Sequence, residues 1–354
     1  MNVLYYPAVS GNPYWEMIQQ GMQQHRVQAQ LWQPWGLRQK TPPVLHLHWL
    51  ESLGMDRLTR RSLLATRLAF HRLERQIQRI QGQGGKVVWT AHNAAPHEHR
   101  DDPHSLLVAE GIARVVQQVD VIISLSQAGV KAIREAQPGA KAPIVVIPHQ
   151  NYVGHYPEGQ GLAYREAVGI PAGARVVGMI GLIRPYKEIE RGIALFREIK
   201  DDNAWLLISG NCFDPALGER LRKLADATPR VVLQIAHLSE QQFADAHAAC
   251  DLVLVAQRKM LNSGSVISAL SLGVPVLSGP TGSLPELQDV AGQEWLQLEA
   301  EIDANHIAAL LQRGRPPGRP DLSPLDLDNV VDQHLHAYGI ARQVYGYEDV
   351  ACVP

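Results

Sequence analysis

The sequence has no long run of apolar residues. Within its 354 residues, no hydrophobic segment approaches the ~20 residues that a helix needs to span a bilayer. Segment 1–6, Met-Asn-Val-Leu-Tyr-Tyr, lacks a basic start and its apolar run is short, so we expect no signal peptide. The sequence therefore predicts a protein that does not cross a membrane, although it can touch one.

Cysteine and net charge are also low. The three cysteines, Cys212, Cys250 and Cys352, have neither an even count nor zinc-type spacing. We therefore expect reduced thiols in a cytoplasmic protein. The 33 Lys and Arg residues against 35 Asp and Glu residues give a net charge of −2, which provides no global electrostatic reason to expect nucleic acid as a partner.

Two familiar signatures are missing. The first strand-loop-helix segment, residues 3–25, lacks the Gly-x-Gly-x-x-Gly pattern, so NAD binding is not expected. The only Asp-x-Asp pair, Asp326 and Asp328, lies in a segment rich in Pro and Gly, residues 312–328, rather than after a buried strand. We therefore expect this pair to face solvent.

What the sequence does contain is a repeated alternation of apolar strands with helical segments, which predicts α/β units with parallel sheets. Loop-like segments between residues 154 and 172 separate the alternation into two halves, each of about 150 residues, a usual domain size. We expect an N-terminal domain over 1–154, a second domain over 172–328, and a last helix over about 329–345 within the segment 329–354. The expected strands are 3–6, 44–48, 86–90, 121–124 and 144–147 in the first half, and 176–180, 205–209, 231–235, 252–255 and 274–277 in the second.

The stretch from Asn262 to Leu277 combines a polar loop of small residues with a short apolar helix. It follows the apolar strand segment 251–256, and Gly273 and Pro275 end the helix. A helix that starts at Ser263-Gly264-Ser265 directs unpaired backbone N–H groups and the positive end of its dipole in one direction, which suits a phosphate. An ordinary capped helix is the alternative interpretation.

A second stretch in the same half, Gly181-Leu-Ile-Arg184-Pro-Tyr-Lys187, places two cations just after another strand. Arg184 and Lys187 are three residues apart and can converge on one anion, because Arg offers a planar fork of donors and Lys a point charge. The alternative is a solvated surface pair. We favour an anion site because a buried strand precedes the two cations.

Candidates for acid–base chemistry lie after the strand 86–90. His92 directly follows that strand, at the edge where α/β sheets place ligands, and Glu98 lies a few residues later. A histidine can accept a proton near neutral pH, and a desolvated glutamate can act as a base. A polar loop with satisfied histidines is the alternative. Further residues that could contact an acceptor are Asn12, Tyr14, His48, Trp49 and His97, with His149, Asn151 and Tyr152 ranked lower.

In their order and spacing, these motifs resemble the GT-B glycosyltransferases, which transfer a sugar from a nucleotide donor. The resemblance covers nearly the whole chain and implies two Rossmann-like domains facing a cleft, with the C-terminal helix crossing back to the first domain. It also implies a metal-independent transferase without a cofactor. The implied donor-binding residues are Gly181, Arg184, Lys187, His237, Leu238, Ser263, Gly264, Ser265 and Glu286, and the Thr90-Ala91-His92 segment resembles the loop whose histidine faces the transferred sugar.

One departure from the family pattern concerns the anomeric outcome. The large retaining branch carries two glutamates around the donor helix, and the matching positions here hold Met260 and Ser268. We therefore expect inversion, with a retaining transferase as the alternative. The Asn-Ser-Gly-Ser segment resembles bacterial exopolysaccharide transferases, including β-mannosyltransferases that use GDP-mannose. This resemblance implies a GDP- or UDP-linked sugar donor and a glycan or glycolipid acceptor in polysaccharide synthesis. A nucleotide-sugar epimerase or hydrolase, or a non-catalytic sugar-binding relative, remains a rival interpretation.

Residues 56–86 form a basic stretch in which many arginines accompany an apolar stripe. A solvated helix face is the default interpretation of such a charge run. The alternative is docking on an anionic membrane, where a lipid-linked acceptor would be found. This alternative would make the cytoplasmic protein peripheral on the inner face of the plasma membrane.

Overall fold

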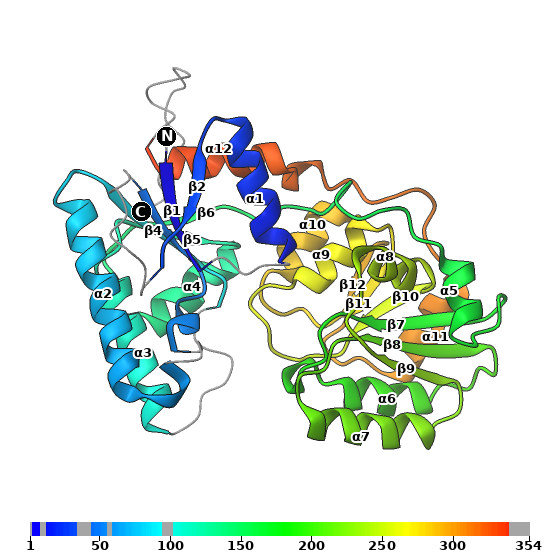
Figure 1. Ribbon diagram of the computed structural model, residues 1–354. Coiled ribbons are helices and arrows are strands. Elements are labelled where there is room, and N and C mark those ends of the chain that lie inside the picture. The colour runs from blue at the N-terminus through cyan, green and yellow to red at the C-terminus, as the bar shows by residue number, and fades with distance from the viewer. Residues whose placement is uncertain (1, 8–11, 34–43, 55–58, 94–101, 340–354) are drawn as a thin grey trace. The chain divides into compact units, whose positions relative to one another are not determined.

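The computed structural model describes residues 2–7, 12–33, 44–54, 59–93 and 102–339, apart from the side chain of Arg61. The chain divides into two compact units (Figure 1). Unit 1 comprises residues 1–150 and 325–354, and unit 2 comprises residues 151–324. The divisions therefore fall a few residues before the boundaries that the loop-like segments suggested.

Unit 1 is built on a six-stranded sheet in the order β2-β1-β3-β4-β5-β6, in which every pair is parallel. Edge strand β2 was not expected, because its Gln-Ala-Gln-Leu sequence is polar and largely exposed. It is held by backbone pairing with β1, which a pattern of side chains does not reveal. The strands are β1 (Asn2–Tyr6), β2 (Gln28–Leu31), β3 (Val44–Leu47), β4 (Lys86–Ala91), β5 (Val121–Ser124) and β6 (Ile144–Val146).

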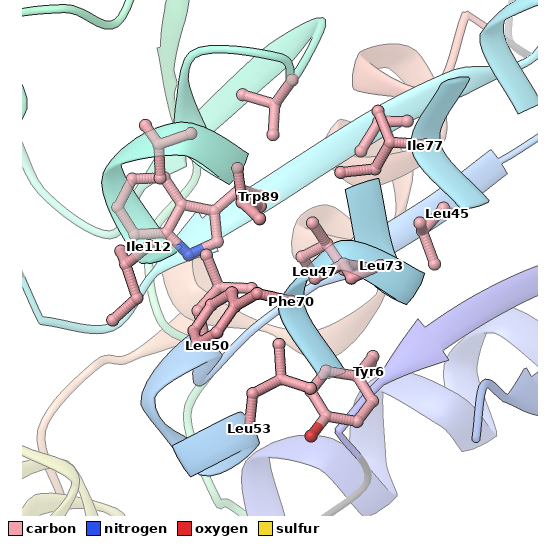
Figure 2. Close-up of a cluster of buried hydrophobic side chains, with 14 of the residues drawn as sticks. Tyr6, Leu45, Leu47, Leu50, Leu53, Phe70, Leu73, Ile77, Trp89 and Ile112 are labelled. Atoms are coloured by element: carbon pink, nitrogen blue, oxygen red, sulfur yellow. The ribbon is translucent and has the colours of Figure 1, made fainter. Parts of the chain in front are cut away.

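Helices cover both faces of this sheet. On one face, α2, α3 and α4 pack against the sheet through a cluster that includes Phe70, Leu73 and Trp89 (Figure 2). On the other face, α1 and α12 contribute side chains such as Ile18 and Val331. The helices are α1 (Pro13–Gln24), η1 (Leu50–Gly54), η2 (Thr59–Arg61), α2 (Leu63–Gln81), α3 (Pro103–Val116), α4 (Gln127–Ala136) and α12 (Leu327–Ala337).

The last helix belongs to unit 1 and packs on α1 so closely that a Cβ at Gly21 would meet the Val331 side chain. It is shorter than the sequence suggested. It ends at Ala337, and Gly339 follows with a φ of 75°, a left-handed conformation that stops a helix and that glycine adopts at low cost. Asp326 and Asp328, at the start of α12, are both exposed, as expected.

Unit 2 contains a second six-stranded parallel sheet, in the order β12-β11-β10-β7-β8-β9. The short strand β12 was not expected from the sequence. Helices α6, α7 and α11 bury one face of the sheet, while α8 contacts β7 and α5. The elements are β7 (Arg175–Ile180), β8 (Ala204–Gly210), β9 (Val231–Ile235), β10 (Leu252–Val255), β11 (Val276–Ser278), β12 (Leu296–Leu298), α5 (Gly161–Ala167), η3 (Pro185–Lys187), α6 (Ile189–Arg197), α7 (Pro215–Asp226), α8 (Glu240–Ala248), α9 (Gly264–Ser271), α10 (Leu284–Ala291), α11 (Ala304–Arg313) and η4 (Ser323–Leu325).

Within the described ranges, none of the helices has both the length and the apolar character needed to cross a bilayer. Cys212 and Cys250 are free thiols, and Cys352 lies outside the described residues.

Candidate active site

The two phosphate-type segments of unit 2 meet in the folded chain. The loop that starts at Gly181 follows β7, and the segment that leads into α9 follows β10. Strands β7 and β10 are parallel neighbours, with Gly178 opposite Val253, so their carboxyl ends open at the same edge of the sheet. There the Nζ of Lys187 donates a hydrogen bond to the Oγ of Ser265 at 2.8 Å, across 78 residues of sequence.

The N-terminus of α9 is organised by its cap. The buried Ser263 accepts a hydrogen bond from the N–H of Val266 through its Oγ, at 3.3 Å. This bond satisfies one of the N–H groups in the first turn. Ser263 thus shapes the helix end, while the Ser265 hydroxyl faces Lys187. The geometry presents a hydroxyl, an ammonium group and a helix N-terminus together, which suits an anion.

The electrostatics of Lys187 fit the same interpretation. Burial lowers the pKa of its ammonium group from 10.5 to about 8, because desolvation penalises the charged form. Among the described residues, no carboxylate pairs with Lys187; its hydrogen-bond partner there is the neutral Ser265. A bound phosphate would restore the charge compensation that the protein itself does not supply.

Arg184, in the same loop, is half-buried. Its guanidinium carbon lies 5.0 Å from the centre of the Phe213 ring, within the range of a cation–π contact. Phe213 follows strand β8 and is 61% exposed, an unusual position for a large apolar side chain. Phe213 was not among the expected residues, although its position just after a buried strand was a usable signal.

A small pocket adjoins these groups. Its lining includes Gly181, Lys187, Ser265 and Gln257. Gln257 is 3% exposed, and its Oε1 has no hydrogen-bond partner among the described residues. Sequence reasoning missed this residue, because a single glutamine after a strand carries no motif.

Three other expected donor residues of unit 2 do not line this pocket. His237 and Leu238 follow the edge strand β9, and His237 is exposed. Glu286 is half-buried in the first turn of α10. None of the three belongs to the pocket lining formed by described residues.

In unit 1, four expected acceptor-side residues gather where β3 and β4 end and α1 begins. His48 Nδ1 and His92 Nε2 lie 3.0 Å apart in a hydrogen bond. The rings of Trp49 and His92 stack with centroids 4.0 Å apart, and the Tyr14 ring meets His92 edge-on at 4.8 Å. His149 also joins this cluster, at 4.8 Å from the Tyr14 ring.

Asn12 is the N-cap of α1, because its Oδ1 accepts a hydrogen bond from the N–H of Tyr14 at 3.0 Å. His97 and Glu98 lie outside the described residues.

Five histidines of unit 1 have lowered pKa values. Burial lowers the pKa of His48 to about 3 and those of His149 and His334 to about 4, and it lowers the pKa values of His46 and His92 well below 6.5. These side chains are therefore neutral at physiological pH. A neutral imidazole donates one hydrogen bond and accepts another, so His92 can hydrogen-bond to a sugar hydroxyl.

A carboxylate that was not among the expected residues contacts Asn93, the residue after His92. Glu51 belongs to η1, which closely follows β3, and its Oε1 accepts a hydrogen bond from the Asn93 side chain at 3.5 Å. Burial raises the pKa of Glu51 above 4.5. The signal that could have revealed it was its position in the segment after a strand end.

Comparison with known proteins gives the family. No protein-family model matches the sequence. However, the chain is 30% identical over 299 residues to the GDP-mannose:glycolipid 4-β-D-mannosyltransferase of Xanthomonas campestris pv. campestris, covering 83% of this chain and 79% of that protein. A second Xanthomonas campestris sequence of the same name is 30% identical over 302 residues, with the same coverage. The chain belongs to this family of glycosyltransferases.

Solved structures show that the transferase has the GT-B fold. Anabaena HepE in complex with UDP-glucose aligns with a TM-score of 0.62 at 16% identity, covering 95% of this chain and all of that one (100%). Sucrose-phosphate synthase from Thermosynechococcus elongatus aligns with a TM-score of 0.63 at 16% identity, covering 97% and 96%. The expected family, α/β GT-B fold and glycosyltransferase class are thereby confirmed.

Proposed function

We propose that this glycosyltransferase moves mannose from GDP-mannose to a lipid-linked glycan during bacterial polysaccharide synthesis, with inversion at the anomeric carbon. The main support for this proposal is the sequence similarity to the Xanthomonas mannosyltransferases over most of both chains. The hydrogen-bonded Lys187 and Ser265 at the N-terminus of α9 support a diphosphate site. The absence of glutamate at positions 260 and 268 supports inversion.

The proposed mechanism has two parts. Lys187 and Arg184, together with the N–H groups of α9, neutralise the leaving diphosphate, so that the bond to the sugar breaks without a metal ion. On the acceptor side, His92 in its neutral form takes the proton of the attacking hydroxyl, with Trp49 and His48 holding its ring. The burial of His92 makes it a weak base, and this observation favours Glu51 as the alternative proton acceptor.

We further propose that the first turns of α2 rest on an anionic membrane. Leu63, Leu64 and Leu68 are 44%, 67% and 45% exposed. Arg67 and Arg75 on the same helix, and Arg60 in η2, are also exposed. Positions 64, 67, 68 and 75 recur at helical spacing on one face of α2, whereas Arg60 precedes the helix in η2. Apolar side chains that enter the lipid and arginines that reach the headgroups favour an interfacial helix.

The experiment that tests the function is a transfer assay with GDP-mannose and a lipid-linked glycan. Donor choice is measured first, by thermal shift with GDP-, UDP- and dTDP-sugars, since a ligand at 100 times its Kd adds about 2.7 kcal/mol to the free energy of unfolding. We expect GDP-mannose to give the largest shift and a β-linked product to form. An α-linked product would identify a retaining transferase. Consumption of the donor without an acceptor would identify an epimerase or hydrolase, and donor binding without turnover would identify a non-catalytic relative.

A further inference from the structure

Gln257 is a buried amide with an unmet hydrogen bond. It lies two residues after the end of strand β10 and lines the pocket that Gly181, Lys187 and Ser265 also line. Only 3% of the residue is exposed, yet its Oε1 has no hydrogen-bond partner in the part of the chain that the structure describes.

Burying an unpaired amide oxygen destabilises the protein when no ligand is bound. The large majority of buried polar side-chain atoms in folded proteins are hydrogen-bonded, because an unpaired one has lost its water without a replacement. An apolar side chain of similar size would fill the same space without this cost. The amide is therefore best explained by a partner that arrives with the ligand.

The chemistry of the pocket restricts which part of a nucleotide sugar this partner can be. Diphosphate oxygens only accept hydrogen bonds, and Lys187, Ser265 and the α9 N-terminus already offer donors. The Oε1 of Gln257 needs an O–H or N–H group. A sugar hydroxyl meets this need whichever way the amide is oriented, because it both donates and accepts.

The transferred sugar is the part of the donor that would otherwise lack a polar partner here. Position 260 is methionine and position 268 is serine, and the described residues that line the pocket include no carboxylate. The sugar is bonded directly to the diphosphate, so a residue that shares a pocket with the diphosphate-binding groups can reach it.

We propose that Gln257 is a specificity-determining residue that hydrogen-bonds to a hydroxyl of the transferred sugar. This inference rests on the proposed nucleotide-sugar site but goes beyond it, because it separates recognition of the sugar from recognition of the nucleotide.

The test compares GDP with GDP-mannose by isothermal titration calorimetry on the full chain. Gln257→Leu should weaken GDP-mannose binding by about tenfold, the effect of one lost hydrogen bond, while the Kd for GDP stays within about twofold. The matched control is Gln288→Leu, because the Gln288 amide is partly buried but donates to the Leu296 carbonyl at 2.7 Å. This control should leave the ratio of the two Kd values unchanged.

Two results would overturn the inference. Equal weakening of GDP and GDP-mannose would mean that Gln257 serves the nucleotide or the fold, and no weakening would mean that a water satisfies the amide. Gln257→Met repeats the test with a more flexible side chain if the leucine variant does not fold. If the wild-type protein prefers another nucleotide sugar, the proposed donor is wrong, and the same comparison is made with that sugar and its nucleoside diphosphate. If it binds no nucleotide sugar, both proposals fail.

Discussion

The Nζ of Lys187 donates to the Oγ of Ser265 at 2.8 Å, although 78 residues separate them in the chain. This contact joins the loop after β7 to the N-terminus of α9. Because a buried ammonium group here has a neutral partner, the pair is suited to receive a diphosphate.

Removing the ammonium group should weaken donor binding. We expect Lys187→Ala to raise the Kd for the nucleotide sugar by roughly 10- to 100-fold, the usual effect of losing one charge-assisted hydrogen bond. Calorimetry measures this change. Lys223→Ala is the control, since Lys223 lies at the surface beside Glu219, 3.7 Å away, and an equal loss in both variants would contradict the site.

The lowered pKa of Lys187 predicts that donor affinity depends on pH. Burial lowers the pKa of Lys187 to about 8 in the free protein, and only the protonated form attracts the diphosphate. Donor affinity should therefore be highest below pH 8 and should fall as the pH rises through that value. In Lys187→Arg the charge persists to higher pH, so any remaining affinity should lose this dependence. An identical alkaline fall in both proteins would assign the effect to another group.

Arg184 should contribute through both its charge and its position over Phe213. We expect Arg184→Ala to weaken donor binding by roughly tenfold or more, and Arg184→Lys to recover only part of the loss because the planar fork is missing. The control is Arg197→Ala, an exposed arginine at the end of α6. Donor affinity that is unchanged in Arg184→Ala would remove this residue from the site.

The lowered pKa values of the histidines in unit 1 predict that its free energy of unfolding decreases at acidic pH. Their pKa values, about 3 for His48 and about 4 for His149 and His334, lie below the unfolded value of 6.5. Below pH 6.5 the unfolded chain therefore binds more protons, and the free energy of unfolding falls as the pH decreases toward 4. Each group contributes a slope of up to about 1.4 kcal/mol per pH unit.

Thermal unfolding followed between pH 7.5 and pH 5 measures this loss. His334→Gln should reduce the slope, whereas His71→Gln should not, because His71 is exposed on α2. A stability that does not change over this range would contradict the burial of the histidines in a neutral state.

The identity of the proton acceptor is decided by paired substitutions on the acceptor side. We expect His92→Ala to lower kcat by at least about 100-fold, a typical contribution of general base catalysis, while the Kd for the donor is unchanged. Glu51→Gln tests the alternative, with the exposed Glu110→Gln as control. If Glu51→Gln alone causes the loss, Glu51 takes the proton and His92 has another role.

Membrane docking predicts that polar substitutions on α2 release the protein from vesicles. We expect Leu64→Glu to weaken binding to phosphatidylglycerol vesicles by about tenfold or more, because inserting one leucine contributes about 1.5–3 kcal/mol. Sedimentation with vesicles measures binding. Leu162→Glu is the control, since Leu162 on α5 in unit 2 is also 67% exposed. Equal binding of the wild type to uncharged phosphatidylcholine vesicles would exclude the role of the arginines.

Local sequence was a good guide to the elements. Apolar runs marked ten of the strands near their observed positions, and the Ser263-Gly264-Ser265 start and Gly273 stop of α9 were visible as capping chemistry. Edge strand β2 was not predicted, because its polar sequence carries no apolar run and the strand is stabilised by backbone pairing. The end of α12 was misplaced because Gly339 was not weighed as a stop signal.

The α/β class, the family and the two segments that offer anion-binding groups could be predicted from the sequence, since strands, caps and motifs depend on residues close together in the chain. The contacts between Lys187 and Ser265 and between His48 and His92 became visible only in the folded chain. The same is true of the place of Gln257 and Glu51 among the candidate residues. Those contacts follow from which strands are neighbours in each sheet. The lowered pKa values follow from burial, and neither strand order nor burial is a property of a short stretch of sequence.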